Sequence, residues 1–168
     1  MLTSSLRAAR FVRFGAAAVL AAAAIGASAA PTATKPFKLN GAFQETPGPS
    51  PRCPSQFGGT IVGFGDSAVT GKVVFLSSDC ITPNGAVYNF SDGKFVILTT
   101  NGEQIFANYS GQFVPTGEGT NYVFNGATYQ ITGGTGKFKK ASGGGTLTGG
   151  EDMATGQGTL QLNGQITY

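Results

Sequence analysis

Alternation of apolar and polar residues is the feature that most constrains how this chain can fold. Near the C-terminus, apolar residues at even positions share one face of an extended segment: Leu160, Leu162, Ile166 and Tyr168. The odd positions between 159 and 167 are Thr, Gln and Asn. The segment from Gln104 to Val114 repeats the pattern, except that Phe106 joins the polar face. A helix would scatter both sets around its circumference, so the pattern predicts β-strands with one buried face.

Turn signals separate the alternating runs. The dipeptides Asn84-Gly85, Asp92-Gly93 and Asn101-Gly102 favour the positive φ angles of tight hairpin turns, and we expect a two-residue hairpin at Asn101-Gly102. Residues 46–51 contain three prolines that cannot donate to a strand ladder, which predicts a loop. Residues 137–142 are compatible with a single helical turn. The predicted strands lie near residues 36–44, 58–65, 71–77, 86–90, 94–100, 103–114, 121–132, 144–149 and 156–167.

Eight or nine antiparallel strands with short connections predict an all-β fold, a closed barrel that leaves no exposed sheet edge. If the apolar face is turned inward, we expect a set of side chains to line the interior: Ile105, Tyr109, Phe113, Leu160 and Leu162. Barrels of about eight strands either fill their interior with side chains or leave room for one small ligand.

The first residues have the pattern of a cleaved signal peptide. Three arginines precede an apolar run from Phe14 to Ile25, which is shorter than the roughly 20 residues of a membrane-spanning helix. The run ends in Ala27-Ser28-Ala29, so we expect cleavage between Ala29 and Ala30. A retained N-terminal anchor is the alternative. The predicted organisation is a signal peptide (1–29), a flexible lead-in with the first strand and a Pro-rich loop (30–57), and the remainder of one barrel domain (58–168).

Charge gives no indication of a nucleic-acid partner. Of the 11 Lys and Arg, three lie in the predicted leader, which leaves 8 against 8 Asp and Glu. The predicted mature domain is therefore neutral, and the pI near 9.0 belongs partly to the leader. We expect no nucleic acid partner and no membrane span in the mature chain.

Cys53 and Cys80 are the two cysteines of the chain, and in an exported protein we expect them to form a disulfide. This predicts a secreted or periplasmic location. We expect no metal centre, because two thiols without any His cannot complete an ordinary zinc site.

The sequence contains few residues suited to catalysis. The absence of His excludes Ser-His-Asp and Cys-His arrangements. Most of the eight carboxylates fall in or beside predicted turns, where turn chemistry accounts for them: Asp79, Asp92, Glu103, Glu118, Glu151 and Asp152. Glu45 and Asp66 lie near predicted strand ends, where either could face a cavity. The Gly-rich segment at 133–137 lacks the spacing and the Ser or Thr of a phosphate-binding loop, so we expect no cofactor and assign no catalytic residue.

The same Gly-rich segment carries a family resemblance. Residues 133–143, with the sequence GGTGKFKKASG, resemble the G-G-T-G-x-F-x-x-A-x-G signature of dirigent proteins and the corresponding turn of allene oxide cyclases. The matching positions are Gly133, Gly134, Thr135, Gly136, Phe138, Ala141 and Gly143. In this chain the glycines permit a tight, positive-φ corner, and Phe138 can cover apolar surface nearby.

The resemblance implies an eight-stranded antiparallel barrel with an apolar central cavity, often trimeric, which steers cyclisation or coupling of hydrophobic small molecules. The acidic and polar cavity residues of those families find no match outside the glycine signature, so none is transferred. The chain is also similar to small exported bacterial proteins of this barrel type that have no assigned activity.

Three classes of function remain open. The first is an exported barrel that binds an apolar small molecule or acts as a stable envelope component, with a homo-oligomer as an option. The second is a cyclase or dirigent-type cavity enzyme. The third is a small outer-membrane barrel, because the chain ends in an alternating segment with an aromatic last residue.

Overall fold

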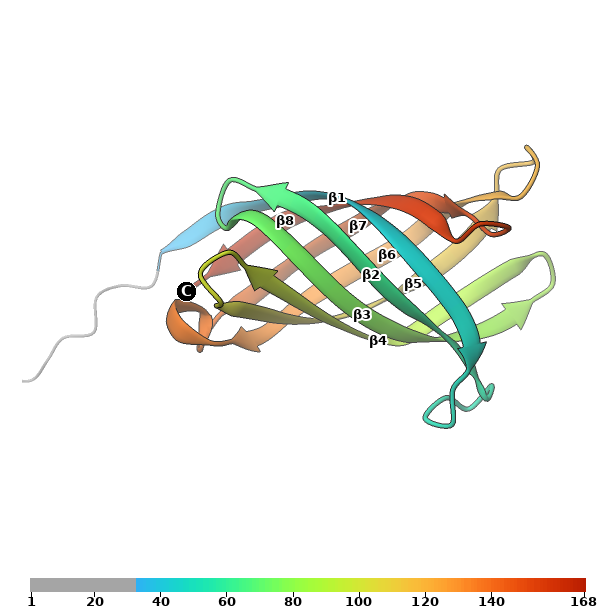
Figure 1. The fold of residues 1–168 in the computed structure, drawn as a ribbon, viewed down its shortest axis with the longest axis horizontal. Helices are drawn as coiled ribbons and strands as arrows, with labels where there is room; N and C mark the ends of the chain where they lie inside the picture. The colour runs from blue at the N-terminus through green and yellow to red at the C-terminus, as the bar shows by residue number, and fades with distance from the viewer. Residues whose placement is uncertain (1–32) are drawn as a thin grey trace, which may run out of the picture. The chain divides into compact units, whose positions relative to one another are not determined.

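The structure, a computed structural model, describes residues 33–168 and contains eight β-strands and one short 3-10 helix. The strands form a closed barrel in which each strand pairs antiparallel with its sequence neighbours and β1 pairs with β8 (Figure 1). This confirms the predicted all-β closed antiparallel barrel. The predicted signal peptide, with its Ala29–Ala30 cleavage site, lies outside the described residues. The elements are β1 (Thr34–Pro49), β2 (Phe57–Ser67), β3 (Gly71–Asn84), β4 (Val87–Thr99), β5 (Gln104–Pro115), β6 (Asn121–Gly134), η1 (Gly136–Phe138), β7 (Ser142–Asp152) and β8 (Gln157–Thr167).

The strand count is eight because Asp92-Gly93 is a bulge and not the predicted hairpin turn. Phe90 pairs with Gly111 and Gly93 pairs with Tyr109, so β4 carries one extra residue within a continuous strand. Asp92 adopts a positive φ of 49° there. A Cβ on Gly93 would lie 2.5 Å from Cδ1 of Tyr109, so glycine is needed for that ring to pack against the strand.

The Pro-rich segment was predicted as a loop, but β1 continues through Pro49. Pro47 pairs with Gly59 and Pro49 with Phe57 on the β2 side. The backbone N–H of Glu45 points to the β8 side, where it donates to the Gly156 carbonyl at 2.7 Å. Because backbone groups alternate along a strand, the nitrogens of Pro47 and Pro49 face the same side. The β1–β8 register ends at Gln44, so the missing proline N–H groups break no ladder bond.

Two of the predicted turns lie at strand connections. Gly85, between β3 and β4, has a φ of 65°, and Gly102, between β4 and β5, has a φ of 84°. The second connection is longer than the expected two-residue hairpin, because β4 ends at Thr99 and β5 begins at Gln104.

The corner between β6 and β7 closes one end of the barrel. Gly133, Gly136 and Gly143 have φ angles of 142°, 55° and 134°, so this corner uses the backbone freedom of glycine. Phe138 of η1 is fully buried, and its ring lies 4.8 Å from that of Tyr168 near the C-terminus. In Figure 1 the helical turn lies beside the C-terminus, at the end opposite the β1–β2 loop.

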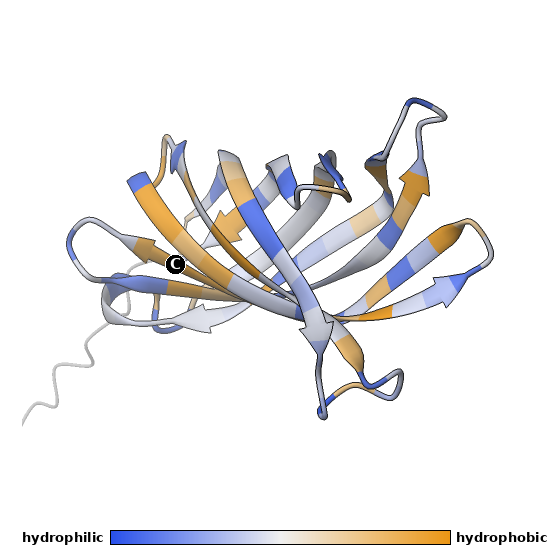
Figure 2. Cartoon of the chain, turned by 45° about the vertical axis from the view of Figure 1, so that its right-hand side comes forward, coloured by the Kyte–Doolittle hydropathy of each residue, from blue (hydrophilic) through white to orange (hydrophobic). Residues whose placement is uncertain are grey.

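Apolar side chains also lie on part of the outer surface, and Figure 2 shows apolar and polar bands alternating along the strands. Val62, Phe64, Val74 and Leu76 are each more than half exposed, and the register places Phe64 beside Val74 and Val62 beside Leu76. We refer to these four residues as the outer apolar face. None of the helices described between residues 33 and 168 is long and apolar enough to cross a membrane.

Candidate functional site

Three carboxyl groups lie inside the barrel at the end opposite η1. Glu45 (β1), Asp79 (β3) and Glu151 (β7) are 4 %, 2 % and 6 % exposed, respectively. Each continues the inward-facing series of its strand, because Glu45 follows Phe43 by two positions and Asp79 follows Ser77 by two. We call these three residues the acid cluster. The end of the barrel that holds them is the acid end.

Glycine gives the acid cluster its space. A Cβ added to Gly59 would clash with Oε1 of Glu45 and would lie 3.1 Å from Oδ1 of Asp79. Any larger residue at position 59 would therefore displace the carboxyl group of Glu45 and crowd that of Asp79.

Asp79 is held by donors from two other strands. Its Oδ1 accepts the backbone N–H of Gly59 at 3.2 Å, and its Oδ2 accepts the hydroxyl of Tyr109 at 2.9 Å. The Tyr109 oxygen also lies 3.3 Å from Oγ of Ser77. The buried Tyr109 hydroxyl therefore has partners within the barrel wall, whereas the hydroxyl of Tyr129 has none among the described residues.

Glu45 and Glu151 have no donor of this kind. Oε1 of Glu45 and Oε2 of Glu151 are buried and meet no hydrogen-bond donor among residues 33–168. When one of the two groups holds a proton, it can donate that proton to the other. Burial, followed by the hydrogen bond and the charge of Glu151, raises the pKa of Glu45 to about 9. Burial also raises the pKa of Glu151, while its hydrogen bond from Glu45 opposes the shift, so Glu45 is the protonated partner at neutral pH.

The pKa of Asp79 is also raised, but less than that of Glu45. Burial is the main cause of its rise to about 7 and Glu45 adds to it, whereas the hydrogen bonds from Tyr109 and Gly59 oppose it. No ion pair relieves the cluster: within the described chain the ion pairs are Arg52–Asp92, Lys94–Asp92 and Lys137–Glu103. The acid end is thus rich in carboxyl oxygens, and no Lys or Arg side chain of the described residues forms an ion pair with them.

A small cavity of about 30 Å³ adjoins the acid cluster. Six aromatic rings contribute to its wall, so two members of the acid cluster, Glu45 and Asp79, meet an otherwise largely apolar space. The volume suits one or two water-sized groups, because a cavity needs roughly 10–15 Å³ to hold a water molecule. The lining residues are Phe43, Glu45, Ile61, Ser77, Asp79, Phe90, Phe95, Tyr109, Phe113, Phe124, Leu147 and Leu160.

The five side chains expected to line the interior are all buried. Tyr109, Phe113 and Leu160 contribute to the cavity wall. Ile105 and Leu162 belong to the packed core and are not among the residues that line this cavity.

Sequence reasoning assigned Asp79 and Glu151 to turns, and this was wrong. Both lie within strands, because β3 continues to Asn84 and β7 continues to Asp152. Each carboxyl stands two residues beyond the strand end that was predicted, at 77 and at 149. Extending the alternation by one step would have placed both side chains on the inner face.

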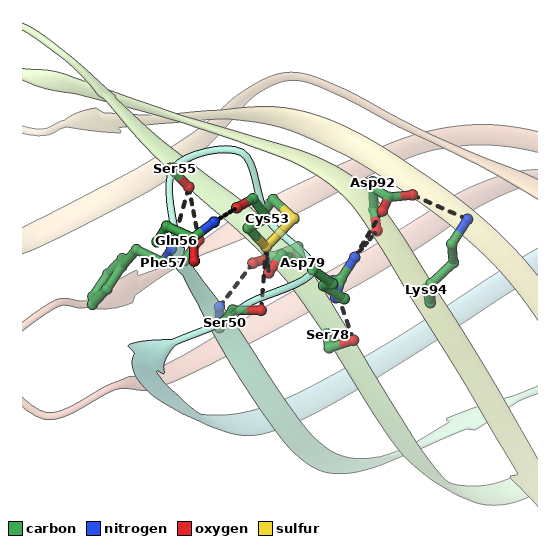
Figure 3. Close-up of a disulfide and its surroundings, with 12 residues drawn as sticks. Ser50, Cys53, Ser55, Gln56, Phe57, Ser78, Asp79, Asp92 and Lys94 are labelled. Carbon is green, nitrogen blue, oxygen red and sulfur yellow. Dashed lines mark hydrogen bonds and ion pairs between the residues drawn. A yellow bond between two sulfur atoms is a disulfide. The ribbon is translucent and has the colours of Figure 1, made fainter.

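The predicted disulfide lies next to the acid cluster. Cys53, in the β1–β2 loop, is bonded to Cys80 of β3 with an S–S distance of 2.09 Å. Figure 3 shows the disulfide of Cys53 close to Asp79. Sγ of Cys53 packs 3.7 Å from the backbone oxygen of Asp79. The bond therefore ties the loop to the strand that carries one of the three carboxyl groups, and it is consistent with an oxidising compartment.

An ion pair on the outside of the barrel supports the same region. Arg52, next to Cys53, lies 2.8 Å from a carboxylate oxygen of Asp92 in the β4 bulge, and Lys94 lies 3.2 Å from the other (Figure 3). The β1–β2 loop is thus attached to β3 by a covalent bond and to β4 by an exposed ion pair.

Among residues 33–168, no group of three or more His, Cys, Asp or Glu side chains has an arrangement that could hold a metal ion. The fold and the site define the class of this protein as an eight-stranded antiparallel barrel with carboxyl groups buried at one end. No family model matches the chain, and no curated protein matches it.

Proposed function

We propose that this protein is an exported barrel that binds a small, largely apolar molecule at the acid end of its interior. The observation that carries the proposal is the cavity beside Oε1 of Glu45, a buried oxygen without a donor among the described residues. Buried polar atoms in folded proteins are nearly always hydrogen-bonded. Within the described chain the partner of the Glu45 carboxyl is that of Glu151, through a shared proton, and a donor on a ligand can take the place of that proton. A ligand with one polar group and an apolar body supplies both the donor and the contact with the aromatic wall.

The cavity admits only the polar end of such a ligand. Partly buried aromatic side chains at the same end of the barrel can contact the remainder. Tyr88 and Tyr122 have ring centroids 5.8 Å apart, and Phe124 packs against Phe43 at 6.2 Å. Tyr122 is the cross-strand neighbour of Glu151, which places these rings near the acid cluster. The other end of the barrel is blocked by Phe138, so entry is expected at the acid end.

The outward-facing side chains of β7 and β8 weigh against an outer-membrane barrel. A membrane barrel carries an apolar band around its entire outer surface. Here the outward positions of β8 are polar, at Thr159, Gln161, Asn163 and Gln165, and those of β7 are Thr146 and Thr148. The outer apolar face lies on the neighbouring strands β2 and β3, and Leu98 of β4, the cross-strand neighbour of Val74, continues it, so it does not encircle the barrel. A homo-oligomer, export through a signal peptide, and membership of the allene oxide cyclase or dirigent superfamily remain predictions.

A cavity enzyme of the cyclase type is the second candidate, and one observation favours it. With a pKa of about 9, Glu45 holds a proton at neutral pH while facing an apolar cavity. A neutral carboxylic acid in such a place can act as a general acid or donate a hydrogen bond to a developing negative charge. Binding of a small molecule at the same place is a requirement of both candidates.

The test is a methyl NMR titration with two probes of equal length, n-hexanol and n-hexylammonium. We expect at least one of them to shift the methyl signals of Ile61, Leu147 and Leu160, which line the cavity, in a saturable way. Shifts of the methyl signals of Val62 and Val74, in the outer apolar face, would instead show that the probe binds on the outside of the barrel. If neither probe shifts the cavity methyls, the proposal is overturned, and a structural role as an envelope component is left.

A pair of matched variants locates the site. Leu147→Phe fills the cavity and should abolish the shifts, whereas Leu162→Phe enlarges a buried side chain that is absent from the cavity wall and should leave them unchanged. The methyl spectrum of Ile105 and Ile166, in the packed core, shows whether each variant is folded. Retained binding in a folded Leu147→Phe variant would place the ligand elsewhere.

A further inference from the structure

The chemistry of the acid cluster indicates which polar group the ligand carries. We propose, on the basis of the proposed function, that the barrel recognises a cation. The ligand carries an ammonium group at the end of an apolar chain. The ammonium group binds Glu45 and Glu151 in place of the proton they share, and the carbon chain contacts the aromatic wall.

Oε1 of Glu45 and Oε2 of Glu151 meet no N–H or hydroxyl donor among the described residues, and their residues are more than nine-tenths buried. The donor available to this pair is the proton of Glu45 itself, and once that proton is lost both groups are acceptors. Glu45 itself lines the cavity. An ammonium group carries three N–H donors and no acceptor, so it can serve both oxygens, whereas a hydroxyl has one donor. Hydrogen bonds between charged partners are also about twice as strong as neutral ones.

The charge balance of the site points the same way. Three carboxyl groups from three strands converge without an ion pair to any of them, since the ion pairs of the described chain lie outside the cluster. The positive charge of Arg52 favours the ionised form of Asp79. Its effect on the pKa of Asp79 is smaller than the effects of burial, of Glu45 and of the two hydrogen bonds. A bound cation would supply the missing positive charge. A carboxylate ligand would instead add a further negative charge.

The aromatic wall suits a cation as well. Six of the residues lining the cavity are Phe or Tyr: Phe43, Phe90, Phe95, Tyr109, Phe113 and Phe124. The faces of aromatic rings attract ammonium groups, and the attraction grows when the site is desolvated. A combination of carboxylates with a ring-lined, water-sized cavity fits an ammonium head attached to an apolar chain.

Binding of a cation must be linked to proton release. At neutral pH Glu45 holds a proton that an incoming ammonium group displaces, because ionised Glu45 is the form that a cation stabilises. The groups that bear on this titration are Asp79 from β3, Glu151 and Asp152 from β7, and the hydroxyl of Tyr109 from β5. We therefore expect the affinity for n-hexylammonium to rise between pH 5 and pH 8, and calorimetry in buffers of different ionisation enthalpy to show protons released on binding.

The deciding comparison is between the two probes of equal length. At pH 8 we expect n-hexylammonium to bind at least about tenfold more tightly than n-hexanol, as expected for a charge-assisted hydrogen bond in place of a neutral one. Equal binding, or tighter binding of n-hexanol, overturns the cation proposal while leaving the proposed function standing. Absence of binding by both probes overturns the proposed function itself.

Two substitutions assign the preference to the acid cluster. Glu45→Gln keeps the size of the side chain but cannot ionise, so it should remove the tenfold preference for n-hexylammonium and the proton release on binding. Glu118→Gln alters an exposed carboxylate in the β5–β6 loop and should change neither. If the preference survives in a folded Glu45→Gln variant, the cation is bound elsewhere and the proposal is wrong.

Discussion

Glu45 determines the behaviour of the acid end at the scale of single residues. Its carboxyl is 4 % exposed, it faces a cavity and its upward pKa shift is caused mainly by burial. The free energy that raises this pKa must come from the stability of the fold, since the unfolded chain ionises the same group at its ordinary value of 4.5. Acidity at this site and stability of the barrel are therefore linked.

The linkage predicts that the barrel becomes less stable as the pH rises. Below pH 4.5, Glu45 is protonated in both states and its contribution is complete. Between pH 4.5 and about 9 the unfolded chain binds fewer protons than the folded protein, so the free energy of unfolding falls by up to about 1.4 kcal/mol per pH unit. Asp79 adds to this fall between its ordinary 3.8 and about 7.

Urea unfolding from pH 5 to pH 9 measures the effect. We expect the Glu45→Gln variant to lose less stability over this range than the original protein, because the amide cannot ionise. Glu118→Gln is the control and should leave the slope unchanged. Identical slopes for the Glu45→Gln variant and the original protein would show that Glu45 ionises normally inside the barrel.

At the scale of elements, the disulfide between Cys53 and Cys80 joins the β1–β2 loop to β3. Its two cysteines are 27 residues apart, and in the chain-entropy model closing such a loop stabilises the folded state by about 3–4 kcal/mol. We expect the free energy of unfolding of the Cys53→Ala/Cys80→Ala variant, measured by urea titration, to be lower by that amount, so that its midpoint moves to a lower urea concentration. Reduction of the original protein should give the same midpoint, and an unchanged midpoint in the variant would contradict the role assigned to the bond.

Alternation and turn residues predicted most of the elements, and the exceptions depend on contacts with distant parts of the chain. Asp92-Gly93 has the composition of a hairpin turn, but the positive φ of Asp92 serves a bulge, and Arg52, 40 residues earlier, pairs with it. The contact with Arg52 forms only when the β1–β2 loop is folded, so the sequence around Asp92 cannot predict it. The prolines after Thr46 were assigned to a loop, because the sequence does not show that β8 ends before reaching them.

The candidate site was harder to predict than the fold for the same reason. Glu45, Asp79 and Glu151 are separated by tens of residues, and the sequence shows no spacing that connects them. Their common inward orientation follows from period two, but their meeting at one end depends on the register of the closed barrel and on Gly59 beneath them. The predicted cavity residues Tyr109 and Phe113 came from the same alternation and lie beside the cluster.

At the scale of the whole molecule, the two ends of the barrel differ in chemistry. One end is filled by Phe138 and its apolar neighbours, and the other holds three carboxyl groups beside aromatic side chains and a loop fixed by a disulfide. This asymmetry is what makes the acid end the candidate binding site. It requires that the three carboxyl groups remain buried in the folded protein and that Glu45 holds its proton at neutral pH.

The most direct test of this account is a pH titration of the side-chain carboxyl carbons by NMR in the folded protein. We predict that the Glu45 carboxyl titrates near pH 9 and the Asp79 carboxyl near pH 7, while that of Asp92, beside Lys94 and Arg52 on the outer surface, titrates below its ordinary value. If the carboxyl groups of Glu45 and Asp79 titrate near pH 4 in the folded barrel, they are solvated and charged at neutral pH, and the buried acid cluster on which the binding site depends does not exist.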